Sequence, residues 1–188
     1  MEKVNMNEIT FEPVIELALD EFKKRLQTAF SLAIIAMNEK ASDEPIPSDQ
    51  DIERNYYNKE AETYNVYKSG QRVGGIIVSI NHLSNHNHLD FFFIDPEHHS
   101  KGIGFEVWRA IEEKYPETEI WQTGTPYFEK RNIHFYVNKC GFQINEFFCE
   151  HHPDPHGQQE DLSDDSDGFD DGFFNFIKIM KNKTHKAD

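Results

Sequence analysis

The chain has 188 residues, which is close to the usual size of one domain and long enough to bury a sizeable core. Its 19 basic and 34 acidic residues give a formal net charge of -15, and such a charge repels phosphate backbones, so we expect no nucleic acid partner. The longest purely apolar run, residues 32–37, is far shorter than the roughly 20 residues that cross a membrane, so we expect no membrane span.

The first predicted elements are a strand and two helices. Residues 9–16 have the character of a strand. The capping-box spacing of Ser48 and Asp51 predicts a polar helix that runs to about Glu62. Between this strand and the polar helix, the sequence predicts a longer helix with an apolar face. That face is formed by Leu19, Phe22, Leu26, Ala29, Phe30, Ala33 and Met37.

The middle of the chain predicts a hairpin, a buried strand and a helix. Residues 62–80 hold two β-type runs around a Lys-Ser-Gly-Gln turn, and residues 89–94 form a short apolar strand. A helix that Pro116 ends follows, with an apolar stripe of Phe105, Trp108 and Ile111.

The last predicted elements are a strand at 118–123, a helix at 132–140 and strands at 142–150 and 173–181. The order β-α-α-β-β-β-α-β-α-β-β indicates an α/β fold with a mixed sheet. We interpret these elements as one domain over residues 1–188.

An acidic segment, residues 150–172, precedes the last strand. It contains nine acidic residues, three histidines and no lysine or arginine, which is typical of a solvated loop. The histidines here and at 82–88 lie in loops that do not supply the convergent geometry of a metal site, so we expect no metal. The start of the chain has no basic-then-apolar signal and the two cysteines form no motif, which favours a cytoplasmic protein with free thiols.

The stretch "FFFIDPEHHSKGIGFEVW", residues 91–108, passes from a strand through two close glycines into a helix. Backbone N–H groups at a helix start bind phosphates, and glycines let the ligand approach the backbone. Gly102 and Gly104 provide that access and Lys101 adds a cation, so a pyrophosphate is the expected ligand. The longer Walker spacing is absent, and Val107 replaces the third glycine of a dinucleotide fingerprint.

Two motifs carry a resemblance to the GNAT superfamily of acetyl-CoA-dependent N-acetyltransferases. The segment "IDPEHHSKGIG" resembles that family's pyrophosphate loop, with His99 at the position of its usual Gln or Arg. The segment "NIHFYVNKCGF" resembles a second family element, on which Tyr136, Gly141 and Phe142 fall. Glu129 stands where the family often has an asparagine, and the nearby Asn132 takes the place of that pantetheine contact.

The resemblance implies a twisted sheet of about six to seven strands, splayed between 89–94 and 119–123 and flanked by about four helices. It also implies that acetyl-CoA is the cosubstrate and that Tyr136 is the general acid that protonates the departing thiolate. The backbone at Phe93 and Ile94 would pair with the pantetheine arm. The full set of implied cofactor-binding residues is Phe93, Ile94, His99, Ser100, Lys101, Gly102, Ile103, Gly104 and Asn132.

The thioester is already activated, so a neutral amine can attack it once both are held close. We therefore expect an N-acetyltransferase whose acceptor is a primary amine, small or cationic. Asp90, Glu119 or a base acting through water remain open as the general base, and a homodimer is an open alternative. A non-catalytic acyl-CoA-binding module and a protein-interaction domain with the same fold are the alternative functions.

Overall fold

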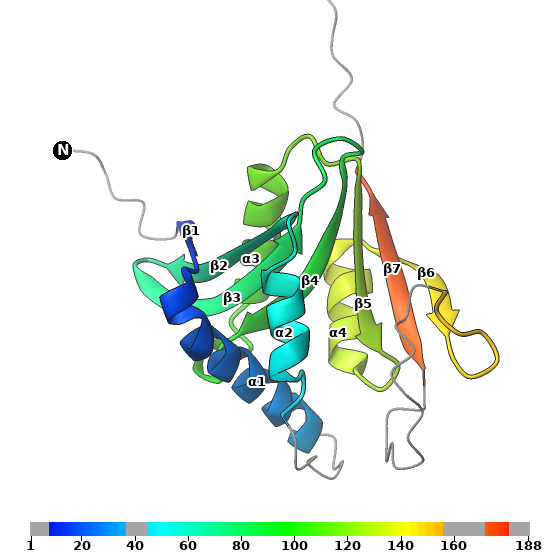
Figure 1. Ribbon diagram of the computed structural model, residues 1–188, viewed down its shortest axis with the longest axis horizontal. Coiled ribbons are helices and arrows are strands. Elements are labelled where there is room, and N and C mark those ends of the chain that lie inside the picture. Colours follow the sequence, from blue (N-terminus) through cyan, green and yellow to red (C-terminus); the bar gives the residue numbers. More distant parts are fainter. Residues whose placement is uncertain (1–7, 37–44, 156–171, 181–188) are drawn as a thin grey trace, which may run out of the picture. The chain divides into compact units, whose positions relative to one another are not determined.

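The computed structural model describes residues 8–36, 45–155 and 172–180 (Figure 1). Contacts within the chain separate two compact units, residues 1–117 and 118–188. Met37 of the predicted helix face and most of the acidic segment lie outside the described residues. The interpretation as a single domain, and the predicted splay of the sheet between the two units, stay predictions.

The first unit contains four strands and three α-helices in its described part, with two short 3₁₀ turns. These elements are β1 (Ile9–Pro13), the turn η1 (Glu16–Ala18), α1 (Leu19–Ala36), α2 (Asp49–Tyr56), β2 (Ala61–Lys68), β3 (Gln71–Ser79), β4 (His86–Ile94), the turn η2 (Pro96–His98) and α3 (Ile103–Lys114).

The strands of the first unit form an antiparallel meander in the order β1-β2-β3-β4. The predicted hairpin is confirmed: Ser69 and Gly70 both have positive φ, 53° and 78°, which matches the twist that a two-residue hairpin turn needs. β4 begins at His86, earlier than predicted, because its polar start pairs with the end of β3 through His88 and Ser79.

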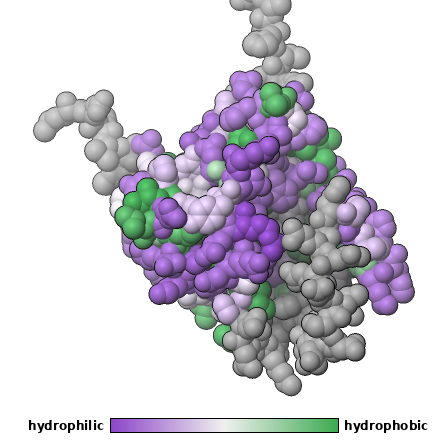
Figure 2. Space-filling model, viewed as in Figure 1, coloured by the Kyte–Doolittle hydropathy of each residue, from purple (hydrophilic) through white to green (hydrophobic). Residues whose placement is uncertain are grey.

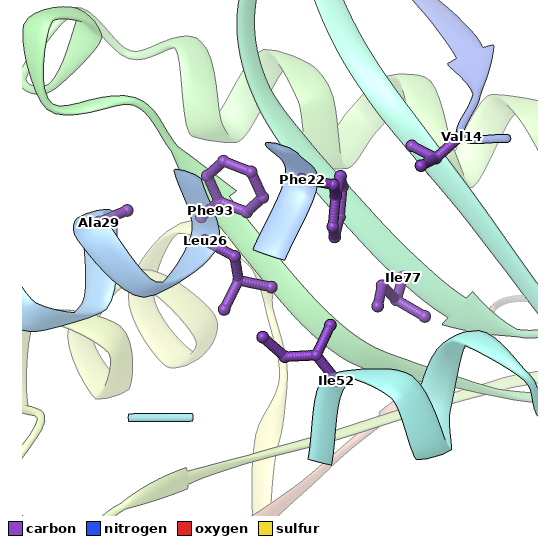
Figure 3. Close-up of a cluster of buried hydrophobic side chains, with 7 residues drawn as sticks. All are labelled: Val14, Phe22, Leu26, Ala29, Ile52, Ile77 and Phe93. Carbon is purple, nitrogen blue, oxygen red and sulfur yellow. The ribbon is translucent and has the colours of Figure 1, made fainter. Parts of the chain in front are cut away.

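The helix α1 covers one face of this sheet. Of its predicted apolar face, Leu19, Phe22, Leu26 and Ala29 are buried and Phe30 is partly buried. Phe22 and Phe93 pack edge to face, with ring centroids 5.4 Å apart (Figure 3). A Cβ at Gly75 would lie 2.5 Å from the Phe22 ring, so only glycine lets the two aromatic rings lie on the strand. The cluster consists of Val14, Phe22, Leu26, Ala29, Ile52, Ile77 and Phe93.

The second helix is shorter than predicted. It begins at the Ser48 cap, whose hydroxyl accepts from the Asp51 N–H, but it ends at Tyr56 rather than near Glu62. Asn58 forms a turn whose side chain accepts from the Glu60 N–H at 3.0 Å, and this local hydrogen bonding competes with further helix. The residues that follow join β2 instead.

The helix α3 contacts β1 and β4 and lies on the sheet face opposite α1 (Figure 1). Trp108 and Ile111 are fully buried, as predicted. The assignment of Phe105 to the same stripe is wrong, because this side chain is 39% exposed. Ile103 and Val107 complete the buried face, since Val107 lies one helical turn and Ile103 two helical turns before Ile111.

The second unit pairs its strands in the order β5-β7-β6, all antiparallel in its described part. The predicted helix at 132–140 is a short α-helix followed by one π-helical turn. The elements are β5 (Ile120–Pro126), α4 (Lys130–His134), the π-helix η3 (Phe135–Cys140), β6 (Gln143–Phe148) and β7 (Phe173–Ile179).

The surface in Figure 2 is mostly hydrophilic, as the net charge predicts, with an apolar patch near the start of α1. Ile15 and Leu17 are exposed in this region. In the part of the chain that the structure describes, no helix is long and apolar enough to cross a membrane. Both cysteines are free thiols, as expected.

Candidate active site

The connection between β4 and α3 forms a tight loop with unusual backbone geometry. Ser100 and Gly102 both have positive φ, 63° and 74°. A residue other than glycine adopts this conformation only at a cost, and such strain is found often at ligand clamps. Gly102 is the N-cap of α3, so its conformation turns the chain directly into the helix.

The loop presents a row of unused hydrogen-bond donors. Within the described residues, none of the backbone N–H groups of residues 100–104 donates a hydrogen bond. The next two N–H groups, at Phe105 and Glu106, donate to the Gly102 carbonyl at 3.1 and 3.3 Å. Five free donors at a helix start match the oxygens of a pyrophosphate, and the helix dipole favours its charge.

His99 braces this loop. Its Nε2 lies 2.7 Å from the Ile94 carbonyl oxygen, and because a carbonyl only accepts, Nε2 carries the hydrogen. The neighbouring Lys101 donates from Nζ to the Glu97 carbonyl at 2.9 Å and is exposed, so its charge stays at the loop surface. The predicted loop residues are therefore brought together, with His99 bonded to the end of β4.

An ion pair that no local sequence pattern predicts anchors the start of the loop. The Arg25 guanidinium of α1 pairs with the Asp95 carboxylate, the residue directly after β4, and both side chains are largely buried, at 17% and 7% exposed. The Asp95 N–H donates to the Val73 carbonyl at 2.9 Å, and the Asp95 carbonyl accepts from the His98 N–H at 2.9 Å. Asp95 therefore ties α1, β3 and the loop together.

Replacing Arg25 by alanine is expected to lower the free energy of unfolding by ~3 kcal/mol, because it leaves the Asp95 carboxylate buried without a cation. The loop also loses its anchor, so the affinity for CoA should fall. Urea titration and calorimetry with CoA measure the two effects.

A matched control is Arg54→Ala, which removes an exposed pair with Asp51 and should cost less than ~1 kcal/mol. Equal losses in the two variants, with unchanged CoA affinity, would contradict the role assigned to the Arg25–Asp95 pair.

Tyr136 lies in the second unit, on the π-helical turn, and is only 6% exposed. The rings of Phe142 and Phe176 surround it, each with its centroid 5.7 Å away. Burial raises the pKa of the Tyr136 hydroxyl far above its usual value, and a hydrogen bond with Thr123 offsets part of that rise. The hydroxyl therefore holds its proton throughout the neutral range.

The buried threonines of β5 bind the polar groups of the helix above them. Asn132 donates from Nδ2 to the Thr125 hydroxyl at 3.3 Å, so its amide side chain has a partner within the second unit. Burial also raises the pKa of the Glu129 carboxyl, which the Arg131 charge partly opposes. The negative charge of Glu129 in turn contributes to the raised pKa of Tyr136.

The α/β fold, with seven strands and four α-helices in the described residues, and the Gly-x-Gly loop at a helix start define an acyltransferase of the GNAT type. Residues 19–142 match the family described as the acetyltransferase (GNAT) family, and the chain belongs to this family. The resemblance predicted from the sequence is thereby confirmed.

The chain is also similar to individual proteins. The uncharacterized protein YrkN of Bacillus subtilis (strain 168) is 48% identical over 184 residues, which cover 97% of this chain and 100% of that protein. A Bacillus subtilis acetyltransferase in complex with CoA has a TM-score of 0.62 at 17% identity and covers 93% of this chain and 99% of its own. A spermidine N-acetyltransferase from Vibrio cholerae, in complex with CoA and spermine, has a TM-score of 0.61 at 12% identity. The match covers 91% of this chain and 95% of that protein's chain. At these identities the solved structures show the fold alone.

Proposed function

We propose that the chain transfers the acetyl group of acetyl-CoA to a primary amine and that residues His99–Gly104 bind the CoA pyrophosphate. The observation that carries this proposal is the row of five free backbone N–H groups at the start of α3. Acetyl-CoA supplies an activated thioester, so the chain needs mainly to bind and orient it. The backbone of Phe93 and Ile94 would hold the pantetheine arm, with Asn132 as a further contact.

Tyr136 is the proposed general acid. A group that must give a proton to a thiolate has to be protonated at neutral pH, and the Tyr136 hydroxyl meets that condition as any tyrosine does. Burial raises its pKa and makes it a weaker acid, so the proposal rests on the family motif on which Tyr136 falls. Burial also excludes water from around the donor. The other interpretation is that Tyr136 only packs against Phe142 and Phe176. In that case, replacing it by phenylalanine would leave turnover unchanged.

The proposed acceptor is a cationic amine. The nine carboxylates of residues 150–172 give the chain a negative field, which attracts cations and repels carboxylate-bearing acceptors. A spermidine N-acetyltransferase among the proteins of the same fold supports the choice of a polyamine as the first compound to test. Action in the cytoplasm, and as a homodimer, stays a prediction.

The acceptor proposal predicts that kcat/KM for spermidine falls as salt rises, because screening limits the field to about 8 Å at physiological ionic strength. Thiol release from acetyl-CoA measures the rate. Replacing Asp164, Asp165, Asp167, Asp170 and Asp171 by Asn should lower kcat/KM for spermidine at low salt and leave CoA affinity unchanged. A neutralised variant as efficient as the parent at low salt would reduce the acidic segment to a solvated surface.

The alternative of a non-catalytic acyl-CoA-binding module is tested by the same assay. Such a module would gain thermal stability with acetyl-CoA but would release no thiol with any amine of a screen. The proposed enzyme gains stability with acetyl-CoA and releases thiol only when an amine is present.

A further inference from the structure

Three polar side chains of the first unit form a chain of hydrogen bonds on β3 and β4. The Ser79 hydroxyl donates to one oxygen of Asp90 at 2.7 Å, and His88 Nδ1 lies 2.7 Å from the other oxygen. Asp90 is 10% exposed, whereas His88 is 41% exposed. The carboxylate is therefore inside the fold and the imidazole reaches the surface.

A β-bulge sets this arrangement. Ile77 pairs with Phe91 and the next residue, Val78, pairs with Leu89, so Asp90 is the extra residue of β4. A bulge re-aims a side chain, and bulges are frequent beside active sites. Here it brings Asp90 to the same side as Ser79 and His88, which are direct partners across the two strands.

The hydrogen bonds decide which of these groups can take a proton. Both Asp90 oxygens are engaged, one by Ser79 and one by His88. A carboxylate only accepts, so Nδ1 of His88 carries the hydrogen and Nε2 of the neutral ring has the free lone pair. Within the described residues the His88 ring makes no second hydrogen bond. Asp90, an open candidate for the base, is thus a positioning residue.

The same strand connects this group to the CoA loop. Ile94 lies six positions after His88, which is roughly 20 Å at the rise of a β-strand. This span is comparable with an extended pantetheine arm, whose pyrophosphate the proposed function places at the end of β4. The imidazole therefore lies at the distance from the loop where the thioester would end.

We propose that His88 is the general base of the acetyl transfer, positioned by Asp90 and Ser79. This inference rests on the proposed function. Nε2 takes one proton from the acceptor ammonium and passes it to water. The neutral amine then forms a C–N bond to the acetyl carbon while the C–S bond breaks, with its electron pair on sulfur. The amide nitrogen then loses its second proton to water, and the general acid takes back from water the proton that it gave to the thiolate.

The test compares His88→Gln and Asp90→Asn with His86→Gln, a matched control on an exposed histidine of the same strand. With acetyl-CoA and spermidine, we expect kcat to fall ~100-fold for His88→Gln, within the usual range for a general base, and KM for acetyl-CoA to stay unchanged. The control should match the parent. Added imidazole should restore part of the activity of a His88→Gly variant.

A second readout does not need an acceptor. ¹⁵N NMR of the imidazole rings should show His88 with its hydrogen on Nδ1, and Asp90→Asn should change that signal. A hydrogen on Nε2, or an unchanged kcat in His88→Gln, would overturn the inference. A parent that neither gains stability with acetyl-CoA nor releases thiol would overturn the proposed function, and this inference with it.

Discussion

Replacing Gly104 by glutamate is expected to abolish the binding of CoA. Gly104 is the second residue of α3, where free N–H groups face the proposed pyrophosphate site, and a carboxylate there adds a charge of the same sign as the ligand. Acetyl-CoA at a hundred times its dissociation constant should stabilise the parent by ~2.7 kcal/mol, and the variant should show no such gain. Thermal unfolding with and without acetyl-CoA measures the difference.

Gly104→Gln is the matched control, because it adds nearly the same volume without the charge. It should keep part of the stabilisation that Gly104→Glu loses. If both variants bind CoA as well as the parent, the loop is not the pyrophosphate site.

Replacing Tyr136 by phenylalanine is expected to lower kcat between roughly ten- and a thousand-fold while CoA still binds. The hydroxyl is the only group removed, and the ring still fills its site against Phe142 and Phe176. Loss of the hydrogen bond with Thr123 should cost about 1 kcal/mol of stability at most, so the variant should fold. Steady-state thiol release under saturating acetyl-CoA measures kcat.

Tyr127→Phe is a suitable control for this variant, since Tyr127 is an exposed tyrosine of the same unit. Its kcat should equal that of the parent. An unchanged kcat in Tyr136→Phe would assign Tyr136 to core packing alone.

Local patterns predicted most of the elements. The Lys-Ser-Gly-Gln turn places its positive φ angles at Ser69 and Gly70, and the stripe of α1 buries Phe22 and Leu26. These features depend on residues close together in the chain, so their periodicity and turn chemistry can be read directly. Two predictions were wrong. Phe105 was assigned to the buried stripe although tertiary packing leaves it exposed, and the second helix was predicted too long because side-chain hydrogen bonding by Asn58 competes with further helix.

Only the part of the candidate site that is formed by backbone groups could be predicted from the sequence. Gly102 and its neighbours carry their signal in the sequence, because glycine spacing reports loop conformation. The Arg25–Asp95 pair joins residues 70 positions apart, and the Ser79–Asp90–His88 group depends on a bulge. Neither a distant ion pair nor a bulge leaves a local pattern in the sequence, so both features could be identified only in the structure.

The pyrophosphate site at residues 100–104 can be tested by a ¹⁵N–¹H titration of the protein with CoA and, separately, with pantetheine, which lacks the pyrophosphate. If residues 100–104 bind the pyrophosphate through their free N–H groups, the amide signals of these residues should move with CoA and stay in place with pantetheine. CoA binding that leaves these five amide signals unmoved would show that residues 100–104 are not the pyrophosphate site.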